Sequence, residues 1–133
     1  MADKLKFTIP GKPEYLTMVR LAIGSVADTM GFDFEEIEDI KTAVSEACKN
    51  VSCHGLEGFA EEYSVECVAE EGCLEIYVTD SSGGQVLERL AKPCQVCPSE
   101  GNLAIFVIQS LMSEVEILDT AQGKKTIKMV KRK

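Results

Sequence analysis

The 133-residue sequence contains no tryptophan, one histidine and four prolines, and it lacks a long apolar run. Its most apolar stretch, residues 103–108, is far shorter than the ~20 residues that a membrane-spanning helix needs. The opening residues, Met1 to Lys6, are polar, and no apolar segment typical of a secretory signal follows them. We therefore expect a cytoplasmic protein that has no membrane partner.

Positive charge is also scarce, because 14 Lys and Arg residues stand against 22 Asp and Glu residues and leave a net charge of −8. A surface that binds nucleic acid needs clustered Lys and Arg side chains to meet the phosphates. The only basic concentration lies between Lys124 and Lys133, where a strand edge with a solvated tail explains it more simply. The composition thus argues against direct binding of nucleic acid.

The remaining composition is that of a folded globular chain, with 45% hydrophobic and 27% charged residues. The length suits one hydrophobic core, and neither an internal repeat nor a Pro- or Gly-rich linker divides the chain. We expect a single domain over residues 1–133.

Six cysteines are distributed along the chain, and in the cytoplasm they are most simply reduced. Cys94 and Cys97 form the one CxxC motif. A zinc site would need two more ligands, which only Cys48, Cys53 and His54 could supply. The other interpretations are a redox pair, whose oxidation would alter this segment, and two reduced cysteines in a surface loop, which is the simplest of the three. The remaining cysteines are Cys67 and Cys73.

The stretch from Phe34 to Gly55 has the strongest pattern in the chain. Its apolar residues recur at steps of three and four, which predicts one face of an amphipathic helix. Asp33 is placed to cap this helix, which we expect to stop near His54 and Gly55. Glu46 and Asn50 are four residues apart and so share one face, and His54 continues their row. Such a row is either a functional site or a solvated helix face. The apolar residues of the stripe are Ile37, Ile40, Ala43, Val44, Ala47 and Val51.

Other segments follow the same two periodicities, 3.6 for helices and 2 for strands. The predicted elements, in chain order, are a strand around residues 5–9, a helix over 15–30 stopped by Gly31, the helix beginning at 34, a hairpin of strands 63–69 and 73–79, a short helix within 85–100, a buried helix over 103–112, and a hairpin of strands 115–117 and 126–130. This order predicts an α/β two-layer sandwich (an α+β arrangement) whose mostly antiparallel sheet is covered by helices.

Three blocks stand in order along the chain: SEACKNVSCHG, VTDSSGG and SEGNLAIFVIQSLMSEVEI. Together they resemble the GHKL (histidine kinase-like) ATPase superfamily and, within it, the bacterial anti-sigma-factor serine/threonine kinases. The segments PEYLTMVRLAIGSVADTMGF and IEDIKTAVSEACKN strengthen the resemblance over the first half. It implies the GHKL, or Bergerat-type, ATP-binding fold, with ATP and Mg²⁺ as cofactors.

The resemblance assigns roles to individual residues. Glu46 matches the general base that accepts the proton of a Ser or Thr hydroxyl, and Asn50 matches the ligand of the Mg²⁺ that the ATP phosphates hold. Asp80 matches the aspartate that accepts a hydrogen bond from the adenine amino group, and guanine has a carbonyl in that place. Gly84 matches the second glycine of the Asp-x-Gly-x-Gly box. Thr126 matches a strand threonine that supports the adenine site through water.

The chain departs from the family pattern in its glycine-rich boxes. Ser82 occupies the first glycine position of Asp-x-Gly-x-Gly, and Gly101-Asn102-Leu103-Ala104 replaces the usual Gly-Leu-Gly before the helix under the phosphates. Gly101 and Asn102 keep the place where backbone amides at a helix start bind phosphate. The segment 85–100 is short for an ATP lid.

Two functions from different classes follow. The first is an anti-sigma factor that binds and sequesters a sigma factor and uses Mg-ATP to phosphorylate a Ser or Thr of an anti-anti-sigma protein of the STAS type. Family members are usually homodimers, and Arg20 matches a position that contacts their partners. The second is a catalytically weakened or nucleotide-free GHKL-fold binding module that sequesters a regulatory partner. Ser82, Asn102 and Ala104 favour the second, and the intact pair of Glu46 and Asn50 favours the first.

Overall fold

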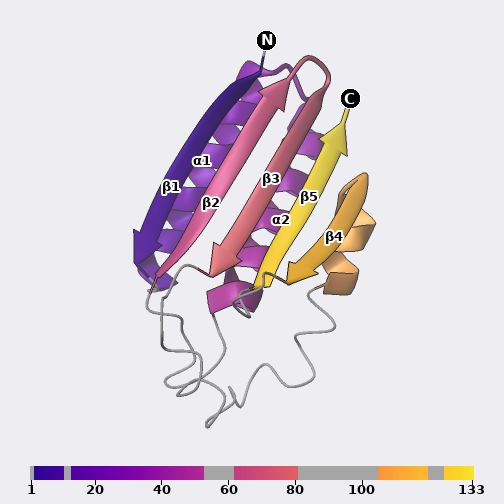
Figure 1. Ribbon diagram of the computed structural model, residues 1–133. Helices are drawn as coiled ribbons and strands as arrows, with labels where there is room; N and C mark the ends of the chain where they lie inside the picture. The colour runs from indigo at the N-terminus through magenta and orange to yellow at the C-terminus, as the bar shows by residue number, and fades with distance from the viewer. Residues whose placement is uncertain (1, 11–12, 53–61, 81–104, 120–124) are drawn as a thin grey trace, which may run out of the picture.

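The computed structural model describes residues 2–10, 13–52, 62–80, 105–119 and 125–133. Its described part has two layers, a five-stranded sheet and helices packed on one of its faces (Figure 1). The strand order is β1-β2-β3-β5-β4, and every neighbouring pair is antiparallel. The predicted α/β two-layer sandwich is confirmed. The strands are β1 (Asp3–Pro10), β2 (Glu62–Glu70), β3 (Cys73–Asp80), β4 (Glu114–Asp119) and β5 (Lys125–Arg132).

The helical layer follows the predicted order of elements. A short 3-10 turn, η1 (Pro13–Tyr15), leads into α1 (Leu16–Thr29), which packs beside α2 (Phe34–Ser52). Helix α2 lies against β2, β3 and β5, and a further helix covers residues 105–111 (Figure 1). The predicted end of α2 near His54 and the short helix within 85–100 lie outside the described residues.

Gly31 ends α1 as the sequence predicts. Its φ of 89° lies in the left-handed region, which glycine enters without the steric cost of a Cβ. Its N–H donates to the Asp28 carbonyl at 3.0 Å, and the N–H of Phe32 donates to the Ala27 carbonyl at 3.2 Å. These two bonds form a Schellman motif, and the buried Phe32 ring anchors the chain as it leaves the helix.

Asp33 caps α2, and Glu36 returns the bond. The N–H of Glu36 donates to Asp33 Oδ1 at 2.8 Å, and the N–H of Asp33 donates to Glu36 Oε1 at 3.0 Å. This reciprocal pair satisfies two backbone donors that a helix start would otherwise leave unbonded. The cap by Asp33 is confirmed, whereas the sequence analysis assigned no return bond to Glu36.

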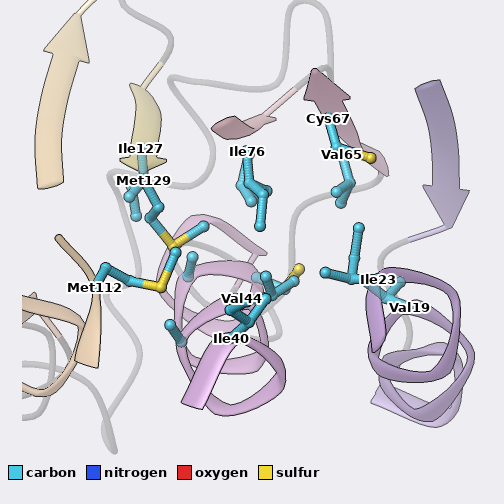
Figure 2. Close-up of a cluster of buried hydrophobic side chains, with 14 of the residues drawn as sticks. Val19, Ile23, Ile40, Val44, Val65, Cys67, Ile76, Met112, Ile127 and Met129 are labelled. Atoms are coloured by element: carbon cyan, nitrogen blue, oxygen red, sulfur yellow. The ribbon is translucent and has the colours of Figure 1, made fainter. Parts of the chain in front are cut away.

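The apolar stripe of α2 forms the middle of the core. Ile40, Ala43, Val44 and Ala47 have no exposed surface. Figure 2 shows Ile40 and Val44 of α2, with Val19 and Ile23 of α1, under the inward side chains of the sheet. Burial of this stripe is what holds α2 at a fixed height and rotation on the sheet. The sheet residues labelled in the same view are Val65, Cys67, Ile76, Ile127 and Met129.

The predicted second hairpin is present, and β4 pairs with β5. However, β5 lies between β3 and β4, so the strand that comes last in the chain is internal and β4 forms the edge. Burial explains this order: Ile127 and Met129 of β5 are fully buried, whereas Ile117 of β4 is 44% exposed. Strand β5, whose helix-facing side chains are fully buried, therefore lies inside the sheet, and β4, whose helix-facing side is partly exposed, lies at its edge.

Candidate functional site

The described residues that the sequence analysis singled out gather at one end of the molecule. Strand β3 ends there at Asp80, β5 begins there, and the C-terminal half of α2 reaches the same end (Figure 1). The strand register brings two of the predicted positions close together, because Thr79, next to Asp80, pairs directly with Thr126. Segments that are far apart in the sequence therefore meet around a shared end of the sheet.

Glu46 lies on the side of α2 that faces away from α1, and Asn50 follows one turn later in the same helix. The opposite side of α2 packs on α1 at Gly24, where an added Cβ would lie 3.0 Å from Cδ of Lys41. Asp39, two turns before Glu46, lies 3.9 Å from Lys131 of β5, measured from Oδ2 to Nζ. The row that contains Glu46 thus runs along the β5 side of α2, and the Glu46 side chain itself is half-buried.

Asp80 is the last residue of β3 and pairs with Tyr63, the second residue of β2. Position 80 belongs to the alternate set of Leu74, Ile76 and Val78, whose side chains are fully buried against the helices. Strand β3 therefore ends with an aspartate next to the start of β2.

A buried polar pair lies next to this strand end, and the sequence analysis missed it. Tyr63 is 1% exposed and Cys48, two residues after Glu46, has no exposed surface. Burial raises the pKa of the Cys48 thiol to about 12, and its hydrogen bond with Tyr63 works in the opposite direction. Burial also raises the pKa of Tyr63, and the charge and hydrogen bonding of Cys48 add to that increase.

The pair connects the C-terminal half of α2 with the start of β2. Within the described residues the Tyr63 hydroxyl has no hydrogen bond of ordinary geometry, and the Cys48 thiol is the group whose interaction adds to the increase in its pKa. The only sequence signal was a tyrosine at the start of an alternating strand, together with a cysteine two residues from Glu46. Neither periodicity nor motif distinguished these residues from ordinary core positions.

Thr126 lies on the other face of the sheet. Its neighbours Ile127 and Met129 alternate with it, and Ile127 and Met129 point toward the helices (Figure 2). The Oγ1 atoms of Thr126 and Thr79 are 3.0 Å apart and share a hydrogen bond across β3 and β5. Thr126 is only 9% exposed, and its hydroxyl is engaged in this bond.

Arg20 lies on α1, one turn before Gly24, on the side of α1 that meets α2. Its side chain is half-buried, and its Nε has no hydrogen-bond partner within the described residues. Exposed apolar side chains flank it on the outer side of the same helix, with Leu21 62% and Met18 44% exposed. Arg20 thus lies beside an exposed apolar surface of α1.

The remaining predicted positions lie outside the described residues. They are Gly84, Gly101 and Asn102 among the proposed cofactor-binding residues, the departures Ser82 and Ala104, His54, and the cysteines Cys53, Cys94 and Cys97. Cys48, which the zinc hypothesis counted as a conceivable ligand, is a fully buried core residue. No helix within the described residues is long and apolar enough to cross a membrane.

The described donor set fits Mg-ATP in its chemistry. Glu46 and Asn50 provide a carboxylate and an amide on adjacent turns of one helix, and Mg²⁺ takes oxygen ligands while keeping waters and phosphates for the rest. Asp80 adds a second carboxylate at the neighbouring end of β3. A carboxylate accepts hydrogen bonds, so it favours a nucleotide base that donates one from an amino group.

An antiparallel sheet covered on one face by helices, with this carboxylate and amide row on the helix over the strand ends, defines the class of histidine kinase-like ATPase folds. Residues 9–131 match the family described as "Histidine kinase-like ATPase domain". The chain belongs to this family, and the resemblance found in the sequence is confirmed.

Relatives and solved structures agree with the assignment. The chain is 40% identical over 126 residues to the "Serine-protein kinase RsbW" of Bacillus pumilus (strain SAFR-032), covering 86% of this chain and 78% of that protein. It is 33% identical over 125 residues to the protein of the same name in Bacillus thuringiensis (strain Al Hakam), covering 87% of this chain and 78% of that protein.

Two solved structures share the fold. One is described as the RsbU and RsbW domains of Rv1364c from Mycobacterium tuberculosis, with a TM-score of 0.68 and 21% identity over 98% of this chain and 32% of that chain. The other is the SiaB-SiaC complex from Pseudomonas aeruginosa, with a TM-score of 0.61 and 15% identity over 96% of this chain and 88% of that chain.

Proposed function

We propose that the protein is an anti-sigma factor with serine/threonine kinase activity. It binds and sequesters a sigma factor, and it uses Mg-ATP to phosphorylate a Ser or Thr of an anti-anti-sigma protein. The observation that carries this proposal is the placement of Glu46 on the β5 side of α2, with Asn50 one turn later in the same helix and Asp80 at the end of β3. The similarity to proteins named serine-protein kinase supports it.

Each residue would have a distinct part. Asp80 would accept the hydrogen bond of an adenine amino group, and Asn50 would provide an oxygen ligand to Mg²⁺. Gly84, Gly101 and Asn102 would border the nucleotide, whereas Thr126, on the other face of the sheet and bonded to Thr79, would have no direct part. Mg-ATP, when bound, supplies the phosphoryl group. Glu46 would accept the proton of the partner's hydroxyl and orient it.

The half-buried position of Glu46 suits that part. A carboxylate at the border between the core and solvent can be reached by a partner's side chain, while the fixed helix holds its direction. Because α2 is anchored by its fully buried stripe, the carboxylate has a defined place relative to the end of β3.

The partners and setting belong to the same proposal. We infer that residues 1–133 act as one ATPase domain in the cytoplasm, that the protein is a homodimer, and that Arg20 contacts a protein partner. The exposed apolar side chains of Met18 and Leu21 beside Arg20 support a contact there. The nucleotide state would decide which partner is held, as a coupling free energy between the two sites.

Calorimetric titration with Mg-ATP tests the site, with GTP as the nucleotide control. We expect micromolar binding of ATP and none of GTP. Asp80→Asn should abolish ATP binding, whereas Asp119→Asn, at the end of the edge strand β4, should leave it unchanged. Equal binding of ATP and GTP, or of ATP by the wild type and Asp80→Asn, would refute the assignment of Asp80.

A second function rests on the altered glycine boxes. Ser82, Asn102 and Ala104 replace or flank residues that let the backbone approach phosphate, so a nucleotide-free module that only sequesters its partner is the competing proposal. It predicts sigma-factor binding that is the same with and without ATP and no heat of nucleotide binding. The kinase proposal predicts that ATP changes the affinity for the sigma factor.

A further inference from the structure

Strand β5 carries a lysine on the helix-covered side of the sheet, and the proposed function gives this lysine no role. Lys131 pairs with Leu74 of β3, whose side chain is fully buried, and it continues the inward set of Ile127 and Met129. The Lys131 side chain is only 14% exposed. A lysine is rarely buried, because its ammonium loses water and needs polar partners in exchange. The partners of Lys131 therefore show what it holds.

Two helices meet at this ammonium. Lys131 Nζ donates to the Leu111 carbonyl oxygen at 2.6 Å, and it lies 3.9 Å from Oδ2 of Asp39 in α2. Leu111 is the last residue of the helix over 105–111, so the bond satisfies a carbonyl that the helix itself leaves without a partner. The helix dipole also favours a cation at this end. We call the Lys131 ammonium, the Leu111 carbonyl and the Asp39 carboxylate the lysine junction.

The backbone on both sides of Lys131 holds the same part of the chain. The N–H of Ser113 donates to the Val130 carbonyl at 2.8 Å, and the N–H of Arg132 donates to Ser113 Oγ at 3.0 Å. These bonds fix the point at which the chain leaves helix 105–111. Lys131 differs from its two neighbours, because its side chain also reaches α2. The junction therefore fixes the end of helix 105–111 relative to α2.

Helix 105–111 has few other anchors. A helix of seven residues gains little stability from its own hydrogen bonds. Within it Ile108 is fully buried, Ile105 and Leu111 are partly buried, and Met112 directly after it is 7% exposed. Figure 2 shows Met112 directed into the core beside Met129. Apolar contacts are non-directional, so these few leave the direction of the helix loosely set unless a polar contact adds to them.

Both helices of the junction are connected with the proposed nucleotide site. Asp39 and Glu46 lie two turns apart on the same side of α2. Helix 105–111 follows Gly101 and Asn102 in the chain, and the proposed function places these two residues beside the nucleotide. The position of this helix relative to α2 thus affects how both sets of residues can meet one ATP molecule.

We propose that Lys131 is a positioning residue for nucleotide binding. Its ammonium holds the end of helix 105–111 against α2 and so sets the direction of the helix, without touching the nucleotide. Lys131 lies near the end of β5, whereas the candidate site lies where β5 begins. A displacement of about 1 Å at a binding group can cost up to about 100-fold in rate or affinity. The inference rests on the proposed function, because it names a residue on which the ATP site of that function depends.

Stability alone does not account for a lysine at this place. An unbranched apolar side chain would fill the same space, and replacing a buried ion pair by apolar groups is often neutral or stabilising. The Asp39 side chain is 35% exposed, so water can solvate its carboxylate when the ammonium is removed. We therefore expect Lys131→Met to retain the circular dichroism spectrum of the wild type and a similar urea midpoint.

Calorimetric titration with Mg-ATP measures the effect on binding. Lys131→Met keeps most of the side-chain volume and removes the ammonium, so its dissociation constant for ATP should rise about tenfold or more. Lys131→Arg keeps a cation with N–H donors and should restore most of the affinity. Lys133→Met is the matched control. Lys133 donates to the Met30 carbonyl at the end of α1, at 3.2 Å, and its loss should leave ATP binding unchanged.

Kinetics separate a positioning role from a catalytic or a structural one. Glu46 is placed by the buried stripe of α2, so Lys131→Met should raise the KM for ATP about tenfold and leave kcat within about twofold of the wild type. Glu46→Gln should instead lower kcat. A residue that only stabilised the fold would reduce the amount of active protein and leave the KM unchanged.

A double-mutant cycle tests the junction itself. Asp39→Asn removes the charge beside the ammonium and should weaken ATP binding less than Lys131→Met does. In the Lys131→Met protein the same change should have no further effect, because Asp39 acts through Lys131. Glu38→Gln, at the adjacent acid that pairs with Lys41 at 3.0 Å, is the control. Additive losses from Asp39→Asn and Lys131→Met would overturn the junction.

The outcomes distinguish this inference from the proposed function. Equal ATP affinity in the wild type and Lys131→Met overturns the inference and leaves the kinase proposal standing. Equal losses in Lys131→Met and Lys133→Met also overturn it, because the effect would then belong to the strand end in general. Failure of Lys131→Arg to recover affinity overturns it as well. A wild type that binds no Mg-ATP overturns the kinase proposal, and the role of Lys131 is then refuted with it.

Discussion

The Cys48 thiol of α2 and the Tyr63 hydroxyl of β2 interact inside the core, and Tyr63 is the strand partner of Asp80. Both side chains are almost completely buried. This thiol–phenol interaction joins the helix that contains Glu46 to the strand that pairs with Asp80. The placement of the site depends on core residues that no motif contains.

The buried thiol predicts a loss of stability at high pH. Below pH 9 Cys48 is protonated in both states and contributes no pH dependence. Above the ordinary pKa of 9.0 the unfolded thiol ionises, whereas the folded one stays neutral until about pH 12. We expect the free energy of unfolding to fall by about 1.4 kcal/mol per pH unit from this thiol once pH exceeds 9.

Urea unfolding at pH 8, 9 and 10 measures this slope. Cys67 acts in the same direction, because burial raises its pKa to about 11. Cys48→Ala should therefore reduce the slope without removing it. An identical slope in wild type and Cys48→Ala would show that the thiol ionises equally in both states.

The reciprocal cap of α2 predicts a local effect on stability. Asp33→Ala removes the acceptor for the Glu36 N–H and leaves the Glu36 carboxylate with a single role in the cap. We expect a loss of about 1 kcal/mol in the free energy of unfolding, measured in urea. Glu35→Ala, in the same turn but without a cap bond, should cost only a few tenths of a kcal/mol. Equal losses in the two variants would contradict the cap.

Glu46 predicts a separation of binding from transfer. Glu46→Gln keeps the side-chain volume and removes the proton acceptor, so phosphoryl transfer to the anti-anti-sigma partner should fall about 100-fold or more. ATP binding and sigma-factor binding should persist, because neither depends on that proton. Radiolabelled phosphate transfer measures the rate, with Glu35→Gln as the control. A rate in Glu46→Gln close to that of the wild type would eliminate Glu46 as the base.

The elements could be predicted from the sequence because their signals are local. The stripe of α2, the stop at Gly31 and the cap at Asp33 each depend on residues within one or two turns, and all three are present. The alternating strands were located for the same reason. The strand order was not predicted. The position of β5 between β3 and β4 depends on how completely the helix-facing side of each strand is buried.

Part of the candidate site could likewise be predicted from local sequence, and part of it depends on tertiary contacts. The adjacency of Glu46 and Asn50 follows from the helical period, so the sequence alone supports it, and the family resemblance added their roles. The pairing of Asp80 with Tyr63, and the buried pair of Cys48 and Tyr63, depend on contacts between segments far apart in the chain. No window of the sequence contains them.

By itself, the sequence determined the class of fold, the family and the row on α2, because periodicity, capping and motif spacing are properties of neighbouring residues. The tertiary structure alone decided the strand order, the face on which Thr126 lies, and its pairing with Thr79. These arise from strand register, which is set by the burial of one complete face against the helices and so involves the whole chain at once.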